Sequence, residues 1–444
     1  MNGVPGRIVV HVAEWKSVTK QGLYLSTADR ALLARLAAHD DRLIIDELRE
    51  GVRVTARSWV GVIRFDYFDV CVEPKLAGDN VGLVDMIAYT TGLSALRRLL
   101  ATRTVQAEET DLFDLLALLF AEACAGVARR GLLADYVTRE DVLPVLRGRL
   151  LPDRQVIKQV GRVDRIECRY DEYDLDIPEN QILTSAINLC MGRVQDDAVS
   201  RQFKRLRALF SEICDPISTD VRVLRSALTY NRRNEHYRDA HNLAWLLIDG
   251  LGVRDVLKSG DTTSFAFLID MNRLFEKFIT KVLTKICDDH SLRVWNQRKD
   301  RSILWDETRG RSYANVIPDL LIGQSQDATW HLPVDAKYKR YDDYKVANAD
   351  IYQTMLYALA YGPKSDTHVP SALLLYPASA PQTVQSVVTV RDMRKQHRGA
   401  IHALGIHIPT LLKEVRDGTD GTVLPIVAKH IDQALIEVHQ TSDA

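Results

Sequence analysis

The sequence predicts a multidomain α/β protein, with a β-rich N-terminal domain, a mainly helical middle domain and a C-terminal domain in which helices flank a mixed central sheet. A chain of 444 residues is too long for one ordinary domain. Short β-branched runs give way to long apolar helical stretches near residue 105, and strands alternate with helices after residue 260. We therefore expect domains at 1–105, 106–260 and 261–444.

The composition gives no global charge signal. The chain has 58 basic and 59 acidic residues, so any nucleic-acid binding would use local basic faces. The six cysteines include no CxxC pair, which excludes a zinc ribbon and suits a reducing cytoplasm. Because no secretory signal and no uninterrupted apolar span is present, we expect a cytoplasmic protein without a membrane partner.

The first part contains mostly short strands. Trp59–Ile63 and Phe68–Glu73 flank a charged turn, which predicts a hairpin. Thr27–Ala38 carries a leucine stripe at helical spacing, and a second helix is expected from Leu83 to Ala101.

The second part carries three strong helical patterns. Leu112–Arg129 is apolar nearly all round, which predicts a central helix that ends at Gly131. Pro178–Val194 begins with proline and has Asp176 placed to cap it. Arg201–Cys214 is amphipathic with a basic polar face, which could contact DNA or be an ordinary solvated face.

In the third part, helices and strands alternate. We expect a long helix over Phe265–Cys287 and a hairpin of Ala314–Ile322 with Thr329–Lys337. A helix over Val346–Tyr361 and a buried strand over Ser371–Tyr376 follow.

The most informative pattern is Pro318-Asp319, followed after fifteen residues by Asp335-Ala336-Lys337. Residues i and i+2 of a strand share a face, so Asp335 and Lys337 project together, and the hairpin brings Asp319 alongside. Two carboxylates on one face suit Mg²⁺, with Mn²⁺ as an alternative. Such a metal polarises a phosphate and lowers the pKa of a bound water, while the lysine orients that water or stabilises developing charge. We therefore predict that Asp319, Asp335 and Lys337 form a catalytic centre.

Three further residues are candidates for the same pocket. Gln353 and Tyr357 lie at i and i+4 on the following helix and could support the site. Glu276 is an acid in an otherwise apolar helical stretch, and we predict it as a further metal ligand. A solvated or salt-bridged role for Glu276 is the alternative.

The segment after the lysine interleaves aromatic and basic residues. Tyr338, Lys339 and Arg340 suit base stacking and phosphate contact, so we predict that they bind DNA. An ordinary solvated loop is the alternative.

This set of motifs resembles the PD-(D/E)XK nuclease superfamily, and Gln353-x-x-x-Tyr357 resembles its RecB-type branch. The resemblance implies a PD-(D/E)XK nuclease fold in the C-terminal domain. It also implies that Asp319 and Asp335 bind metal, that Lys337 is catalytic, and that Gln353 and Tyr357 support the site or touch DNA.

The rest of the chain, from about residue 40 to 377, resembles the McrC family. The segments that carry this likeness are Val60–Ile63, Val70–Lys75, Arg130–Leu132 with Tyr136, Leu146–Arg149 and Cys168–Asn180. The resemblance implies the nuclease subunit of an McrBC-type modification-dependent restriction system, acting on modified double-stranded DNA. It also implies an N-terminal domain that docks on an McrB-like hexamer, an AAA+ GTPase or ATPase, and stimulates its NTP hydrolysis. The segment after about residue 377 matches nothing we can place.

The sequence contains no GxxxxGK[ST] motif, so we expect no nucleotide to be bound by this chain itself. Two alternatives stay open. One is a regulatory adaptor whose nuclease fold bridges two motor rings, and the other is a stand-alone DNA repair nuclease.

Overall fold

The structure is a computed structural model. It describes residues 8–37, 43–92, 111–162, 164–214, 225, 228–251, 264–290, 292–324, 331–339, 341, 345–363, 369–381, 383–418 and 421–436.

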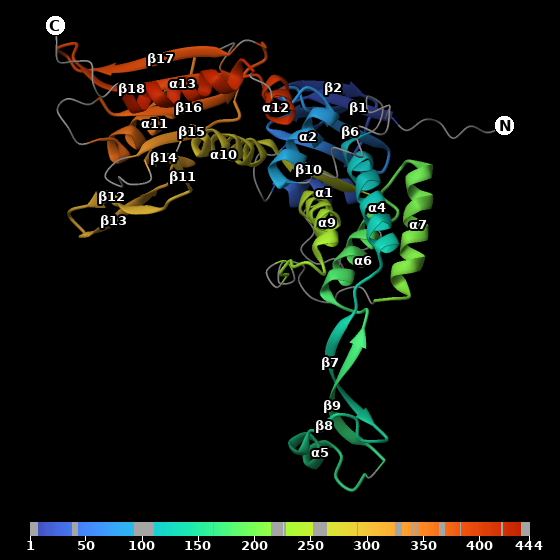
Figure 1. The fold of residues 1–444 in the computed structure, drawn as a ribbon. Coiled ribbons are helices and arrows are strands. Elements are labelled where there is room, and N and C mark those ends of the chain that lie inside the picture. Colours follow the sequence, from blue (N-terminus) through green and yellow to red (C-terminus); the bar gives the residue numbers. More distant parts are fainter. Residues whose placement is uncertain are drawn as a thin grey trace.

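The predicted mixed α/β architecture with several sheets is confirmed (Figure 1). The N-terminal sheets lie against a group of helices, the C-terminal sheet lies beyond α10, and a long β-ribbon extends away from the body. One continuous apolar core joins residues of the N-terminal sheet, the helices and the C-terminal sheet. None of the described helices has the length and hydropathy needed to cross a membrane.

The first N-terminal sheet has the order β1-β6-β5-β10. Its strands are β1 (Ile8–Ala13), β6 (Phe68–Glu73), β5 (Trp59–Arg64) and β10 (Phe265–Asp270). The predicted hairpin is present, since β5 and β6 pair antiparallel. β1 pairs parallel with β6 on the other side.

A second, three-stranded sheet packs beside the first. It consists of β2 (Ser17–Gln21), β4 (Gly51–Ala56) and β3 (Leu43–Leu48), all antiparallel. The predicted helices of this part are present as α1 (Thr27–Ala37) and α2 (Asn80–Thr91). The predicted continuation of α2 to residue 101 lies outside the described residues.

The predicted single helix over Phe265–Cys287 is wrong in its first turns. Residues Phe265–Asp270 form β10, which pairs antiparallel with β5, and the helix α10 begins only at Met271 and ends at Asp289. The Asp270 side chain caps α10 by accepting backbone hydrogen bonds from its first turn. A short, fully buried apolar run has no periodicity that separates strand from helix. The strand therefore adds residues beyond the expected boundary at 260 to the N-terminal sheet.

The helices of the middle part pack around α4. They are α4 (Leu112–Arg130), α6 (Pro178–Cys190), α7 (Asp197–Ser211), the 3-10 helix η1 (Glu235–Tyr237) and α9 (Arg238–Gly250). The expected burial of α4 and the expected end at Gly131 are confirmed. Asp176 does not cap α6; it accepts a hydrogen bond from the side chain of Gln181 instead.

A three-stranded antiparallel ribbon interrupts these helices and was not predicted. It consists of β7 (Asp135–Leu143), β9 (Ile166–Asp174) and β8 (Arg149–Leu150), with the short helix α5 (Pro152–Lys158) at its end. We call residues 135–174 the arm. The arm projects away from the rest of the molecule (Figure 1), and none of its described residues joins the continuous core.

The C-terminal sheet is mixed and has the order β11-β14-β15-β16-β18-β17. Its strands are β11 (Leu292–Asn296), β14 (Leu320–Gln324), β15 (Leu332–Ala336), β16 (Ser371–Pro377), β18 (His397–Ile406) and β17 (Val384–Arg391). The flanking helices besides α10 are α11 (Asn348–Tyr361), α12 (Ile408–Asp417) and α13 (Val423–Ile436). The residues after 377, which the sequence left without a role, supply two strands and two helices of this unit.

The predicted strand over Ala314–Ile322 is divided. Its first part belongs to β13 (Arg311–Val316), which pairs with β12 (Asp300–Asp306) in a separate hairpin. Residues 317–319 are not in a strand, and β14 then pairs antiparallel with β15 as expected. Pro318 has no backbone N–H to donate, which favours such an interruption. Asp319 therefore lies at the break, immediately before β14.

Candidate active site

The structure brings Asp319 and Asp335 together at the centre of the C-terminal sheet. Asp335 lies on β15, between β14 and β16, and its side chain is only 2% exposed. The Oδ2 atom of Asp319 accepts a hydrogen bond from the backbone N–H of Ala336, at 2.8 Å. This bond fixes the first aspartate to the strand that carries the second.

Lys337 shares the face of Asp335, as the strand period predicts. Its Nζ atom lies 3.0 Å from Oδ2 of Asp335. Its backbone N–H donates to the carbonyl of Leu375, at 2.9 Å, and so continues the pairing of β15 with β16. The two residues therefore form a partly buried ion pair on a rigid strand.

Burial perturbs all three groups. Burial, then the neighbouring Asp335, raises the pKa of Asp319 to about 7. Burial also raises the pKa of Asp335, although Lys337 opposes this. For Lys337 burial alone would lower the pKa, but the surrounding carboxylates of Asp335, Asp319 and Asp350 raise it on balance. The site thus holds more carboxylates than cations, which is favourable for a bound cation.

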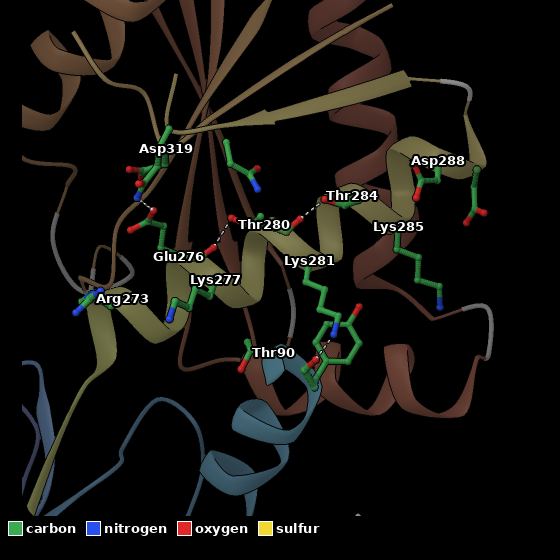
Figure 2. Close-up of a pocket in the computed structure, with 14 residues that line it drawn as sticks. Thr90, Arg273, Glu276, Lys277, Thr280, Lys281, Thr284, Lys285, Asp288 and Asp319 are labelled. Atoms are coloured by element: carbon green, nitrogen blue, oxygen red, sulfur yellow. Dashed lines mark hydrogen bonds between the residues drawn. The ribbon is translucent and has the colours of Figure 1, made fainter. Parts of the chain in front are cut away.

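Glu276 lies on α10 and faces the same hollow as Asp319 (Figure 2). The hollow has a volume of about 1000 Å³. Oε1 of Glu276 accepts a hydrogen bond from Nε2 of Gln297, at 2.6 Å, and the Glu276 charge contributes to the raised pKa of Asp319. The structure therefore places all three predicted acids in one region.

Gln353 and Tyr357 are paired on α11. Nε2 of Gln353 donates to the Tyr357 hydroxyl, at 2.7 Å, and that hydroxyl donates to the carbonyl of Ile317, at 3.1 Å. The buried Tyr357 thus holds the break in the chain just before Asp319. Its position supports the first aspartate through the backbone.

The prediction that Tyr338 contacts DNA is wrong. Its side chain is 1% exposed and packs against Phe275, with ring centroids 5.7 Å apart. Its hydroxyl donates a hydrogen bond to Oε2 of Glu14, at 3.0 Å. The alternation that turns Lys337 toward the site turns the next residue toward the core.

Of the two basic residues that follow Tyr338, the structure describes Lys339. Lys339 is exposed, and its Nζ atom is paired with Oδ2 of Asp350, at 2.8 Å. Bonds from Lys339 and Tyr341 hold the pKa of Asp350 below its usual range, although burial, the largest influence, acts in the opposite direction. Arg340 lies outside the described residues.

Sequence reasoning missed Glu14, which is 1% exposed. Its Oε2 atom also accepts the backbone N–H of Lys75, at 2.9 Å. Burial raises the pKa of Glu14 to about 7, although bonds from Lys75 and Tyr338 oppose the shift. Nothing in the local sequence singles out this residue, because its partners come from distant segments.

The donor set fits a hard divalent cation. Oδ2 of Asp335 is buried and accepts no well-directed hydrogen bond from any described residue, despite the nearby Lys337. The described residues contain no group of three or more His, Cys, Asp or Glu side chains that could hold a metal ion. Two aspartates suit Mg²⁺ nonetheless, since this ion is usually bound by one or two carboxylates and keeps several waters.

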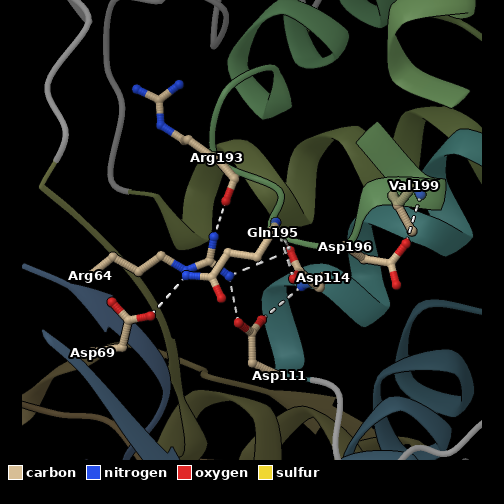
Figure 3. Close-up of polar contacts among 8 residues, drawn as sticks. All are labelled: Arg64, Asp69, Asp111, Asp114, Arg193, Gln195, Asp196 and Val199. Atoms are coloured by element: carbon tan, nitrogen blue, oxygen red, sulfur yellow. Dashed lines mark hydrogen bonds and ion pairs between the residues drawn. The ribbon is translucent and has the colours of Figure 1, made fainter. Parts of the chain in front are cut away.

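A second buried polar cluster lies elsewhere, between β5 and the start of α4 (Figure 3). The guanidinium of Arg64 lies 2.5 Å from Oδ2 of Asp111 and 3.4 Å from Oδ1 of Asp114, and it also donates to the carbonyl of Arg193. Burial, then Asp111, raises the pKa of Asp114 to about 6, against the effect of Arg64. Arg64 is thus paired with both Asp111 and Asp114, so this cluster joins the sheet to the helices.

Comparison with known proteins identifies relatives of the chain. Residues 54–377 match the family model described as "McrBC 5-methylcytosine restriction system component". No curated protein matches the sequence. Among solved structures, the chain is similar to one in the refined half-complex of a tetradecameric assembly of Thermococcus gammatolerans McrB AAA+ hexamers with bound McrC. The TM-score is 0.61 and the identity 16%, over 96% of this chain and 99% of that chain.

A second match is weaker. It is to a chain of the Thermococcus gammatolerans McrBC complex determined by cryo-electron microscopy, with a TM-score of 0.45 and 20% identity over 63% of this chain and 88% of that chain. At 16% identity, the likeness to the first structure speaks for the fold alone.

Proposed function

The chain belongs to the McrBC 5-methylcytosine restriction system component family, and from this premise we propose that it is the DNA-cleaving subunit of an McrBC-like restriction complex. The observation that carries the proposal is the group of Asp319, Asp335 and Lys337 on adjoining segments of one sheet. A buried carboxylate next to a second, partly buried one opposes folding unless the pair binds a cation, and perturbed groups of this kind mark functional sites. The nuclease motif and the C-terminal PD-(D/E)XK fold are part of this proposal.

Asp319 and Asp335 would hold a Mg²⁺ ion, with Glu276 available from α10. A bound Mg²⁺ supplies a Lewis acid for the phosphate and a more acidic water. Lys337 has a raised pKa, so it stays protonated at neutral pH and acts as a cationic donor rather than a base. It is placed to stabilise charge that develops on the phosphate as water attacks and one P–O bond breaks. Tyr357 acts as a positioning residue, since it holds the backbone beside Asp319.

The arm is the proposed docking site for an AAA+ partner. Its far end exposes a group of apolar side chains, namely Val145, Leu146, Val156, Ile157 and Val160. Clustered exposed apolar residues mark protein contacts. The structural neighbour is described as McrC bound to McrB AAA+ hexamers, and the present sequence has no P-loop of its own. The resemblance implied docking through the N-terminal domain; the exposed apolar residues are the reason that we propose the arm instead.

The substrate we propose is double-stranded DNA with modified cytosine, because the family description names 5-methylcytosine. We propose GTP or ATP hydrolysis on the partner alone. The measurement that tests the function is cleavage of methylated and unmethylated plasmid in Mg²⁺. Reactions contain this protein and its AAA+ partner, with and without nucleotide.

We expect cleavage that requires the partner, the nucleotide and Asp335. Asp335→Asn should abolish cleavage and leave stimulation of the partner's NTP hydrolysis intact. Cleavage by this chain alone would identify a stand-alone nuclease. If wild type stimulates the partner and never cuts, the chain is an adaptor.

A further inference from the structure

The hollow in front of Asp319 continues along α10 (Figure 2). Glu276 and Asp319 lie at one end of it, and the exposed half of the helix forms its wall. The opposite half of α10 is fixed in the core by Leu274, Phe275, Phe278, Ile279 and Val282. The helix therefore presents a fixed set of side chains to the hollow.

Four basic residues follow one another along this wall, at intervals of four positions. They are Arg273, Lys277, Lys281 and Lys285, all exposed and all lining the hollow, and we call them the α10 track. Four residues rise about 6 Å along a helix, so the track is about 18 Å long. Because four residues exceed one turn of 3.6, it winds gently around the helix. The track begins beside Glu276, at the candidate site.

Three charges of the track have no counter-charge among the described residues. No described residue forms an ion pair or hydrogen bond with the side chain of Arg273, Lys277 or Lys285. Lys281 donates to the carbonyl of Tyr89, at 2.7 Å, and its Nζ atom lies 5.4 Å from the centroid of the Tyr89 ring. The acidic residues of the hollow lie at its two ends: Glu276 and Asp319 at one, and Asp288 and Asp289 at the other. In a chain with a net charge of −1, this is a local concentration of positive charge.

We propose that the α10 track binds the phosphate backbone of the DNA strand that enters the site at Asp319. The inference rests on the proposed function, and adds the surface that guides the substrate. A row of cations suits a polyanion, and phosphates recur about every 3.4 Å along each strand of a duplex. The track therefore spans about five base-pair steps.

The chemistry of the track favours backbone contact over base recognition. Arginine and lysine contacts to phosphate orient DNA and carry no sequence information. The hydroxyls of Thr280 and Thr284, which also line the hollow, donate to carbonyls of their own helix, at 2.7 and 2.8 Å. The track thus binds modified and unmodified DNA alike, and recognition of the modification lies elsewhere.

The helix α7 offers a matched control. Its exposed face carries Arg201, Lys204, Arg205 and Arg207, in number equal to the track. It belongs to the helical part of the molecule, away from the C-terminal sheet (Figure 1). Removal of two charges there changes the net charge as much as removal of two from the track.

The test is binding of the full-length protein to a short labelled duplex, measured by fluorescence anisotropy in EDTA over a series of salt concentrations. Lys277→Ala/Lys285→Ala should weaken binding by about tenfold and reduce the slope of log K against log salt by nearly two. Lys204→Ala/Arg207→Ala should bind as wild type does. Methylated and unmethylated duplexes should give the same result.

Cleavage assays with the partner separate this inference from the proposed function. Wild-type affinity in the track variant overturns the inference, and so does loss of binding in the α7 variant alone. Neither result affects the proposed function if wild type still cuts and Asp335→Asn does not. Conversely, in a further outcome the track variant loses binding as expected while Asp335→Asn still cuts DNA. That result would support the inference about the track and refute the catalytic role of the aspartates.

Discussion

The arm and the candidate active site both contain many charged side chains. On the arm these charges are paired in water, whereas in the site carboxylates are withdrawn from water. On the arm, Glu140 lies 2.6 Å from Arg154 and 2.5 Å from Arg169; both arginine side chains are exposed and the Glu140 side chain is partly exposed. In the site, the buried Asp335 and the partly buried Asp319 lie beside Lys337. Matched charges in water add little to stability. Unmatched carboxylates in a core oppose folding, which is typical of residues retained for chemistry.

The apolar residues of the two regions also differ: they are buried next to the site and exposed on the arm. Every residue of β16, which runs next to the site, is buried. The far end of the arm instead exposes Val156 and Ile157 at 68% and 80%. The strand next to the site therefore buries its apolar residues, whereas the arm exposes the surface that we propose for partner docking.

Asp319→Asn should have the largest effect. Loss of this carboxylate should reduce cleavage by about a thousandfold or more, because metal binding and charge stabilisation both depend on it. The raised pKa of Asp319 means that its ionisation opposes folding progressively as the pH rises above about 4 and fully above about 7. At pH 8 in EDTA the variant should therefore melt several degrees higher than wild type, at about 2–4 °C per kcal/mol.

The amide keeps an acceptor for the N–H of Ala336, so the local geometry should survive. Calorimetry at pH 8 checks the direction of the change. A lower Tm for the variant than for wild type would contradict the inference that the ionised Asp319 carboxylate opposes folding.

Ile157→Asp should impair partner stimulation through the arm and leave the stability of the protein almost unchanged. The side chain is 80% exposed, so the change should alter the free energy of unfolding by less than about 0.5 kcal/mol. It should reduce stimulation of the AAA+ partner's NTP hydrolysis by about tenfold or more, since a central apolar contact carries much of the affinity of an interface.

Met393→Asp is the matched control, because Met393 is a fully exposed apolar residue between β17 and β18 of the C-terminal sheet. It should leave stimulation unchanged. Equal losses in both variants would show that the arm has no special role.

Glu14→Gln should have the smallest effect, visible mainly as a change in pH dependence. The pKa of Glu14 is about 7 in the folded protein and about 4.5 when unperturbed, so its stabilising contribution is complete below pH 4.5 and is lost as the pH rises to 7. Glutamine mimics the protonated form and keeps an acceptor for Tyr338. Between pH 5 and pH 8, wild type should lose on the order of 2–3 kcal/mol more than the variant.

Thermal unfolding at several pH values measures this difference. Glu73→Gln on the same sheet serves as the control, because Glu73 is exposed and paired with His11. Parallel pH profiles for wild type and Glu14→Gln would exclude the buried carboxyl as the cause.

The parts of the fold that were predictable have strong local patterns. The strands β5 and β6 are β-branched and aromatic runs joined by a charged turn, and α4 is apolar over most of its nineteen residues. The arm has neither signal, since β7 is exposed along both faces and carries charge throughout. A strand without a buried face shows no apolar alternation, so sequence reasoning passed over it.

The positions of the site residues on and beside the strand β15 could be predicted from the sequence. The side-chain contacts with distant segments could not. The period of two placed Lys337 on the face of Asp335, and the hairpin placed Asp319 nearby. The burial of Tyr338 depends on Glu14, which is 324 positions away in the chain. Contacts of that range follow from packing, so local chemistry misassigned Tyr338 to the surface.

The pairing of β10 with β5 also governs the order in which this protein can fold during synthesis. The N-terminal sheet is complete only after residue 270 has left the ribosome, although its other strands lie within the first 73 residues. Until then β5 is an open edge with apolar residues on both sides, a state that favours pairing with other chains. A fragment that stops near residue 260 should therefore aggregate, and an expression fragment of the N-terminal part has to extend through Asp270.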